Sequence, residues 1–373
     1  MNKKMSTIMV LVALIASTAI FAIPMGSESV DAAGGFTITD VEGKTVSFDG
    51  PADHVIALGL GLTLTVIELG MKDKIVGVDS YSAPDYSSNA QYRDILEGLT
   101  SIGNYYNAGG REQILTTIVQ MIDSGKIDAK GLVIIAPNYS YIKSDTDGLI
   151  KMMNDRGLDF KIVLLAKSGM MFDDIVPFVK NVGKIVGASD IDRVVADMEL
   201  VKTEVSKVVA EKGLSDAPAI HLTSSSTPTI YNSSILLSMV DIAGGKNVGS
   251  NGTTSGSYAT DYAAIVQIIE KHPNVTIFLD EGNPNTVAEF RSKIGNPTGV
   301  TVMKMDPTFN NTSPSVSKGL WTVAGALYPE YFDGEIPSTE DDPDNMFLYL
   351  AIGIILALVV VGAIVLILRK KGN

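Results

Sequence analysis

The chain has 373 residues, a formal net charge of −13 at pH 7 and no cysteine. The lack of cysteine excludes a disulfide framework, a thiolate metal site and a cysteine nucleophile. The negative charge disfavours binding to nucleic acid and to anionic lipid head groups, so we expect no nucleic-acid partner. The body of the chain is too long for one typical hydrophobic core, which favours two lobes.

The N-terminal segment has the pattern of a secretory signal peptide. Lys3 and Lys4 precede an apolar run over residues 8–23 that contains small residues such as Ala16 and Ala19. A basic start, a short apolar region and small residues for cleavage define such a signal. We expect residues 1–33 to form a signal peptide and leader, with an uncleaved anchor as the alternative.

The C-terminal segment has the pattern of a membrane span. Residues 346–368 contain no charged side chain, and the basic residues of 369–373 follow directly. An apolar run of this length is typical of a transmembrane helix with a cytoplasmic tail. The acidic segment 333–345 is then predicted to be a tether between the body and this helix. Together the ends predict a single-pass protein of the cell membrane, with its body extracytoplasmic at the cell surface.

Between the ends, short β-branched runs alternate with helical stretches, which is the pattern of an α/β fold. Such nearly continuous apolar runs are typical of parallel strands that are covered on both faces. We expect an N-terminal α/β lobe over residues 34–170 and a C-terminal α/β lobe over residues 214–332. The expected strands are 54–58, 75–78, 132–136 and 161–165 in the first lobe, and 219–222, 275–279 and 300–303 in the second.

A long helical region with few helix breakers separates the two sets of strands. Residues 172–186 carry apolar side chains near helical spacing. A second helix is expected from an N-cap at Ser189 to about residue 211, where Gly213 is placed to end it. Residues 171–213 therefore predict a stiff helical bridge.

Four motifs in chain order carry a family resemblance. The first comprises residues 36–48 (FTITDVEGKTVSF), 54–58 and 69–79 (LGMKDKIVGVD). The others are Gly103 ahead of 111–115 (REQIL), residues 242–248 (IAGGKNV), and Ser313-Pro314 ahead of a helix that ends in 327–332 (LYPEYF). In this order they resemble the class III substrate-binding proteins, which are the receptors of ABC importers for iron chelates, haem and cobalamin. The resemblance covers residues 36–332.

The resemblance implies two Rossmann-like lobes joined by a long rigid helix, with the ligand in the cleft between the lobes and limited closure on binding. It implies an ABC importer permease and ATPase as partners and a small metal-chelate ligand, such as a siderophore complex, haem or cobalamin, as cargo for iron or cobalamin transport. We expect no cofactor and no enzymatic activity.

Loops at the carboxyl ends of the strands are expected to line the cleft. Tyrosines concentrate in these loops, and a tyrosine offers a flat apolar face and a hydroxyl that suit bulky or planar ligands. Tyrosines that only cap the lobe surfaces are the alternative. The candidate ligand-binding residues are Tyr81, Tyr86, Asn104, Tyr105, Tyr106, Tyr139, Tyr141 and Tyr258.

Proteins of this family dock onto the permease through one acidic residue on each lobe. The matching positions are Glu112 and Asp261, where the shorter aspartate replaces the usual glutamate. Three histidines are too few for a zinc or manganese receptor, so we expect no metal site. Direct ligation of Fe³⁺ by Tyr105 or Tyr106 and binding of an intact haem, cobalamin or siderophore complex both stay open.

Two other readings of the same fold remain. A surface adhesin or sensor ectodomain is one, and a metal-cofactor enzyme is the other. Asp280 and Glu281 end an expected strand, as catalytic carboxylates often do, but neighbouring residues of a strand point to opposite faces. No Ser/His/Asp set, metal motif or phosphate loop is recognisable in the sequence.

Overall fold

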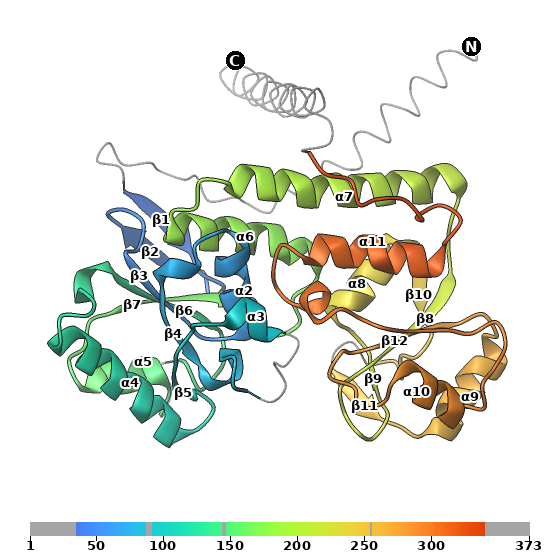
Figure 1. Ribbon diagram of the computed structural model, residues 1–373, viewed down its shortest axis with the longest axis horizontal. Coiled ribbons are helices and arrows are strands. Elements are labelled where there is room, and N and C mark those ends of the chain that lie inside the picture. Colours follow the sequence, from blue (N-terminus) through green and yellow to red (C-terminus); the bar gives the residue numbers. More distant parts are fainter. Residues whose placement is uncertain (1–34, 87–91, 144–146, 254–255, 340–373) are drawn as a thin grey trace, which may run out of the picture. The chain divides into compact units, whose positions relative to one another are not determined.

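The computed structural model describes residues 35–86, 92–143, 147–253 and 256–339 (Figure 1). The chain divides after Gly50 into two compact units, which are described separately. The first contains an antiparallel hairpin of β1 (Phe36–Thr39) and β2 (Thr45–Phe48). The Asp40 side chain accepts hydrogen bonds from Glu42 N and Lys44 N and so holds the turn.

The second unit begins with a five-stranded parallel sheet in the order β5-β4-β3-β6-β7. Its strands are β3 (His54–Ala57), β4 (Ile75–Asp79), β5 (Ser101–Gly103), β6 (Leu132–Pro137) and β7 (Lys161–Ala166). The four expected strands of the first lobe are confirmed. All six residues of β6 are buried, as expected for a central parallel strand.

In the described part of this lobe, four α-helices accompany the sheet: α2 (Leu60–Glu68), α3 (Arg93–Leu96), α4 (Ala108–Asp123) and α5 (Leu149–Asp155). Ile114 and Ile118 of α4 pack with Ile56 of β3 and Ile134 of β6 in one buried cluster. We call this sheet and its helices the first lobe. The strand order changes direction between β3 and β6, and the carboxyl ends of strands at such a switch point are the usual binding edge of an open α/β sheet.

The second sheet has the order β11-β9-β8-β12-β13, and β10 also pairs with β8. Its strands are β8 (Ala217–Leu222), β9 (Thr229–Tyr231), β10 (Gly245–Asn247), β11 (Ser257–Ala259), β12 (Thr276–Leu279) and β13 (Thr301–Lys304). The three expected strands are confirmed, but the sheet is not purely parallel. β9 runs antiparallel to both β8 and β11. Strands of three residues carry too little periodicity to be read from sequence.

The helices beside this sheet are α8 (Ile235–Ile242), α9 (Tyr262–Lys271), α10 (Val287–Lys293) and α11 (Val316–Leu327). Ile265 and Phe290, from α9 and α10, are buried against Ile220 of β8 and Ile277 of β12. The opposite face of the sheet carries His221 and Phe278 towards the side on which α8 packs. We call this assembly the second lobe.

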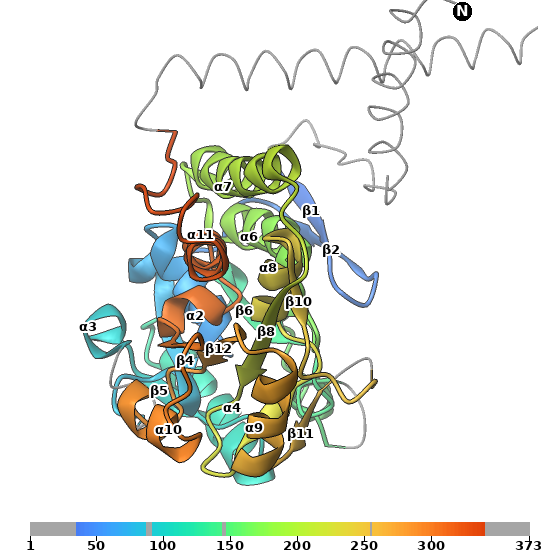
Figure 2. The ribbon, with the colours of Figure 1, turned by 90° about the vertical axis from the view of Figure 1, so that its right-hand side faces the viewer.

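The bridge consists of two helices, as the residue pattern predicts, whereas the resemblance implied a single long helix. α6 (Phe172–Val186) has the expected bounds, and α7 (Ile191–Lys212) ends at Gly213 in the left-handed conformation, as predicted. The expected N-cap at Ser189 is wrong. Asp190 occupies that position without a side-chain capping bond; its carboxylate accepts a hydrogen bond from the Ser189 hydroxyl and pairs with Arg193. α6 packs against α2 and α8, so the bridge contacts both lobes, and α7 packs on α6 and α11 (Figures 1 and 2).

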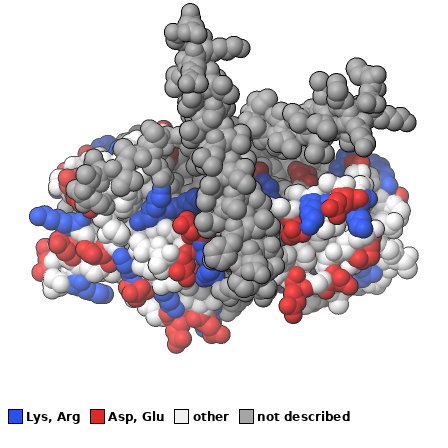
Figure 3. Space-filling model, turned by 90° about the horizontal axis from the view of Figure 1, so that it is seen from above, with Lys and Arg blue, Asp and Glu red and all other residues white. Residues whose placement is uncertain are grey.

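The outer surface of α7 carries charges of both signs. Arg193 pairs with Asp190 and Asp197, and Lys202 pairs with Asp173 of α6. Figure 3 shows basic and acidic side chains interspersed on this side, wherever undescribed residues do not cover the view. Exposed ion pairs of this kind contribute little stability. Because charges of both signs alternate here, this side does not carry an electrostatic potential of a single sign.

A segment of the chain close to its C-terminal end returns to the first lobe. Residues 311–315, which we call the closing segment, lie against α2. The Thr65 hydroxyl donates to the Thr312 carbonyl oxygen at 2.8 Å, and Glu68 accepts from Ser313 Oγ at 2.9 Å and from Ser315 N at 2.8 Å. Gly61 makes this approach possible, because a β-carbon at that position would lie 1.9 Å from Thr312 Oγ1.

The expectation of a single-pass membrane protein is corrected. Among the described residues, no helix is both long and apolar enough to cross a membrane. α7 has the length, with 22 residues, but acidic and basic side chains occur throughout it. The expected signal peptide at 1–33 and the expected transmembrane helix at 346–368 lie outside the described residues.

Candidate functional site

Six tyrosines form one continuous aromatic cluster at the carboxyl-end loops of β4, β5 and β6. The ring centroids of Tyr105 and Tyr106 are 4.3 Å apart in a stacked arrangement. The Tyr106 ring lies 5.0 Å from that of Tyr81 and 5.5 Å from that of Tyr141, both edge to face. The members of this tyrosine cluster are Tyr81, Tyr86, Tyr105, Tyr106, Tyr139 and Tyr141. All six are sequence candidates, and the structure brings them together.

A buried carboxylate positions the first of these loops. Asp79, the last residue of β4, is fully buried and accepts hydrogen bonds from Gly59 N at 2.6 Å, Tyr81 N at 2.9 Å and Ser82 Oγ at 2.6 Å. These bonds cap the short 3₁₀ helix that carries Tyr81 and tie it to the start of α2. Burial raises the pKa of the Asp79 carboxyl, and the three hydrogen bonds oppose that rise.

The second loop follows β5, where Asn104 connects two tyrosines. Its side-chain oxygen accepts from Tyr106 N at 2.8 Å, and its amide donates to the Tyr81 hydroxyl at 3.3 Å. Arg111 of α4 lies beneath, only 2% exposed, and donates to the Tyr105 carbonyl at 2.9 Å and to Asp147 at 2.8 Å. Asn104 and Arg111 thus fix the backbone that presents Tyr105 and Tyr106.

The phenols at the centre of the cluster are held in the neutral form. Tyr105 is 3% exposed and Tyr106 is 40% exposed, and their hydroxyls are 3.0 Å apart. Burial raises the pKa of both, and for Tyr105 the hydrogen bond to Tyr106 and the negative charge of Asp79 raise it further. Ionising Tyr105 would therefore be costly, which favours stacking and hydrogen bonding over phenolate chemistry.

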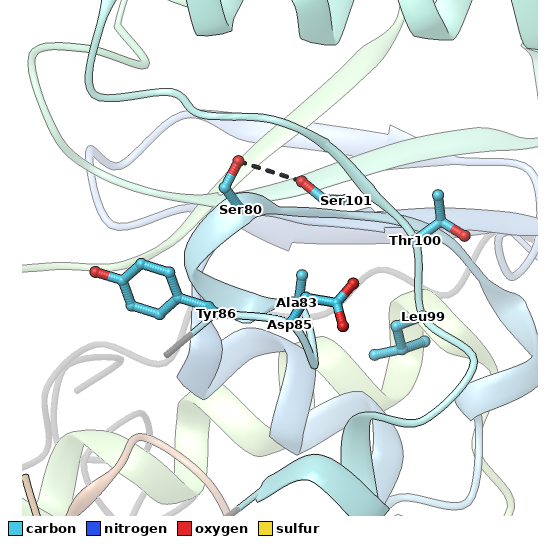
Figure 4. Close-up of a pocket in the computed structure, with 7 residues that line it drawn as sticks. All are labelled: Ser80, Ala83, Asp85, Tyr86, Leu99, Thr100 and Ser101. Atoms are coloured by element: carbon cyan, nitrogen blue, oxygen red, sulfur yellow. Dashed lines mark hydrogen bonds between the residues drawn. The ribbon is translucent and has the colours of Figure 1, made fainter. Parts of the chain in front are cut away.

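A pocket of about 550 Å³ adjoins the cluster at Tyr86 (Figure 4). In Figure 4 the Tyr86 ring points away from Thr100, whereas the Asp85 carboxylate points to the side on which Leu99 and Thr100 lie. The described lining consists of Ser80, Ala83, Asp85, Tyr86, Leu99, Thr100 and Ser101. Tyr86 belongs to both features, since its ring contacts that of Tyr81 at 4.8 Å.

The eighth candidate, Tyr258, lies apart from the cluster. It is in β11 of the second lobe, where its hydroxyl donates to the Gly249 carbonyl at 2.6 Å and its ring packs against the lobe's core. Those contacts give Tyr258 a structural role in its own lobe.

The second lobe contains a polar network that its sequence does not indicate. His221 Nε2 is 2.8 Å from Asp280 Oδ1, and His221 Nδ1 is 2.9 Å from Ser234 Oγ. The Tyr231 hydroxyl donates to Asp280 Oδ2 at 3.3 Å, and its ring stacks on the His221 ring at 4.5 Å. Asp280 immediately follows β12, so the network ends at the carboxyl edge of the sheet. The sequence placed His221 in an expected strand and Asp280 after another, but it did not indicate that the two side chains meet.

This network contains a serine, a histidine and an aspartate, but its geometry is that of a structural network. His221 is fully buried, so its ring cannot reach a substrate. Ser234 caps α8, and its oxygen accepts from Leu237 N at 3.1 Å. Within the described residues there is also no group of three or more histidine, cysteine or acidic side chains that could hold a metal ion.

The two acidic residues expected at a docking surface both engage local partners. Glu112, on α4, forms an ion pair with Arg156, and the hydrogen bond from that guanidinium lowers the pKa of the carboxyl. Asp261 caps α9 by accepting from Ala264 N at 2.7 Å. Both side chains lie on the surface, one on each lobe.

The fold is similar to that of solved bacterial solute-binding proteins. A periplasmic solute-binding protein from Veillonella parvula has a TM-score of 0.58 and 16% identity, covering 84% of this chain and 92% of that protein. The Helicobacter pylori protein CeuE, in a Ni–His complex, has a TM-score of 0.55 and 14% identity, covering 80% and 90%. A periplasmic haem-binding protein from Pseudomonas aeruginosa has a TM-score of 0.53 and 16% identity, covering 74% and 93%.

Neither a protein-family model nor a curated protein sequence matches this chain. At such low identities the structural likeness establishes the fold alone; two of these three structures are described as a haem-binding and a solute-binding protein. The chain has the two-lobed α/β fold of the class III substrate-binding proteins, as the sequence motifs predicted.

Proposed function

We propose that this chain is a substrate-binding protein that captures an intact metal chelate and delivers it to the permease of an ABC importer. The observation that carries the proposal is the tyrosine cluster, which lies at the carboxyl-end loops of a parallel sheet with a direction change between β3 and β6. Proteins of this fold include one that binds haem and one solved with a Ni–His complex. No catalytic step is part of the proposal.

The chemistry of the cluster favours a bulky ligand with a flat or aromatic surface. Tyr106 and Tyr141 are 40% and 42% exposed, which is high for aromatic side chains that also contact other rings. Aromatic side chains lose little conformational entropy on binding and present large apolar faces. A haem, a corrin or an aromatic chelator would stack on this surface and accept hydrogen bonds from the neutral phenols.

Direct binding of ferric ion by the phenols is the less favoured form of the proposal. Ligation requires a phenolate, and the pKa of Tyr105 is raised by burial, by Tyr106 and by Asp79. The second lobe contributes no group of metal ligands among the described residues. The ligand is therefore proposed to arrive with its metal already coordinated.

Docking to the permease is proposed to use Glu112 on the first lobe and Asp261 on the second. Acidic side chains that meet basic residues of a partner mainly set the rate and orientation of encounter. Both carboxylates are exposed, although each already has a local partner. The pairing of Glu112 with Arg156 would have to open or be shared on docking.

The test is ligand binding by the full chain, measured by thermal shift and by equilibrium titration. The probes are haem, cobalamin, ferric siderophores and the Ni–His complex. A ligand that binds only the folded state raises the melting temperature with its concentration. Failure of every probe to bind the folded protein would contradict the proposal.

A pair of variants locates the site. Tyr106→Ala removes the central ring of the cluster, and Tyr331→Ala removes a tyrosine of the same 40% exposure outside it. We expect Tyr106→Ala to weaken binding about 5- to 30-fold, because a lost aromatic contact is worth about 1–2 kcal/mol. Tyr331→Ala should bind as the unaltered protein does. Equal effects of the two variants would place the ligand elsewhere.

A further inference from the structure

We propose that the pocket beside Tyr86 binds an uncharged polyhydroxylated group of the ligand, such as a sugar ring. This inference rests on the proposed function, because it assigns to the pocket one part of a ligand whose aromatic part contacts the tyrosine cluster. The pocket volume of about 550 Å³ lies within the range of about 300–1,000 Å³ found for small-molecule sites.

The pocket and the cluster are continuous. Tyr86 lines the pocket, its ring meets that of Tyr81 edge to face, and Tyr81 contacts Tyr106 in the same way. Ser80, at the start of the turn that Asp79 fixes, is directly followed by Tyr81 in the 3₁₀ helix. A ligand that stacks on the exposed Tyr106 ring can therefore extend past Tyr81 and Tyr86 towards the pocket.

The polar lining is rich in hydroxyls. Ser80, Thr100 and Ser101 each supply one, and the hydroxyls of Ser80 and Ser101 are 3.2 Å apart (Figure 4). A hydroxyl both donates and accepts, so such a surface matches a group that also carries hydroxyls of both roles. The Asp85 carboxylate adds an acceptor, as is suited to two neighbouring hydroxyl donors.

Three other classes of occupant fit less well. An anionic group would meet Asp85 with no lysine or arginine among the described lining residues. An apolar group would form no hydrogen bonds with the lining hydroxyls or with the Asp85 carboxylate, and among the described lining residues only Ala83 and Leu99 have wholly apolar side chains. A simple cation would gain little from one exposed carboxylate in water.

The first experiment probes the pocket without the chelate. Saturation-transfer NMR on the full chain is recorded with methyl β-glucoside as the probe. The variants are Asp85→Ala and Ser101→Ala, and Ser189→Ala is the matched control because its exposed hydroxyl lies on the bridge. We expect transfer to the glucoside in the unaltered protein and in Ser189→Ala, and loss of at least two-thirds of it in the two pocket variants. Equal transfer in all four proteins, or none in any, would overturn the inference.

The second experiment tests whether one ligand occupies the pocket and the tyrosine cluster together. A ferric tris-catecholate chelate and the same chelate carrying glucosyl groups are titrated into each protein. We expect the glucosylated form to bind about tenfold more tightly, or about 1.4 kcal/mol, and the pocket variants to abolish that difference. Equal affinities for the two forms would refute the inference while leaving the proposed function standing. If neither chelate form binds, and haem and cobalamin also do not bind, the proposed function is refuted. The glucoside experiment alone would then decide whether the pocket binds a sugar.

Discussion

The substitution Gly61→Ala tests how tightly the closing segment is seated on α2. A β-carbon at position 61 would lie 1.9 Å from Thr312 Oγ1 and 3.2 Å from Thr312 N. The first distance is far inside van der Waals contact and could be relieved only by moving the threonine. The second involves the backbone, so the whole closing segment would have to shift away from α2.

The expected cost follows from two opposing effects. Overpacking of a closely fitted contact costs about 1–3 kcal/mol, and a shift of Thr312 would also weaken the hydrogen bond from Thr65, worth about 0.5–1.5 kcal/mol. Alanine is the better helix former by about 1 kcal/mol. The sum predicts a loss of about 0.5–3.5 kcal/mol in the free energy of unfolding.

The assay is urea unfolding of the full chain, with Gly109→Ala as the matched control. Gly109 also lies in a helix, but its nearest atom is Asn107 Oδ1 at an ordinary 3.7 Å. That variant should be as stable as the parent or more so. In the double variant Gly61→Ala, Thr312→Ala the hydroxyl clash is absent, so part of the loss should be recovered. If Gly61→Ala were as stable as Gly109→Ala, the close approach of the closing segment to α2 would be refuted.

Three further outcomes are expected. Burial raises the pKa of Glu68 above its ordinary 4.5, so the protonated carboxyl stabilises the folded state fully below pH 4.5 and this stabilisation is lost as the pH rises through the folded-state pKa. The free energy of unfolding in urea should therefore decline less steeply above pH 4.5 in Glu68→Gln than in the parent. Identical pH profiles of the two proteins would contradict this. His221→Leu removes one hydrogen-bond partner from the Asp280 carboxylate and one from the Ser234 hydroxyl, and it should lower the free energy of unfolding by about 1–3 kcal/mol. An unchanged urea midpoint would show that the network contributes nothing. Glu112→Gln should preserve ligand affinity and melting temperature but reduce ligand-dependent ATPase stimulation of the importer, and unaltered stimulation would remove Glu112 from the docking surface.

The parallel core of each lobe could be predicted because its strands coincide with nearly continuous apolar runs in the sequence. Residues 132–136 are apolar without interruption, and β6 is buried along its whole length. The bounds of α6 and the end of α7 at Gly213 also followed from periodicity and from one well-placed glycine. β9 and β11 did not, because three-residue strands carry no readable pattern.

The candidate site was predictable to the extent that it depends on which loops follow which strands. Tyr81, Tyr105 and Tyr139 follow β4, β5 and β6 of one parallel sheet, so the loops that carry them share its carboxyl edge. Tyr258 shows the limit of that argument, because a loop position does not say where a side chain points. Its hydroxyl bonds to the Gly249 carbonyl within its own lobe.

The second-lobe network shows a different limit. His221 and Asp280 are 59 residues apart and meet only because β8 and β12 pair in a particular register. Nothing local to either residue marks that pairing. A sequence reading could reasonably place His221 in a strand and expect a satisfied histidine, but it could not name Asp280 and Ser234 as its partners.

The contact between the closing segment and α2 forms late during synthesis of the protein. The hydrogen bond from Thr65 to Thr312 joins residues 247 positions apart. At a translation rate of about 5–20 residues per second, α2 would wait about 12–50 s for that partner to be made. During this interval Gly61, Thr65 and Glu68 present an uncovered helix face on a newly made lobe. The ribosome-bound chain should accordingly be a better chaperone client than the finished protein, and release of residue 315 from the exit tunnel should end that dependence.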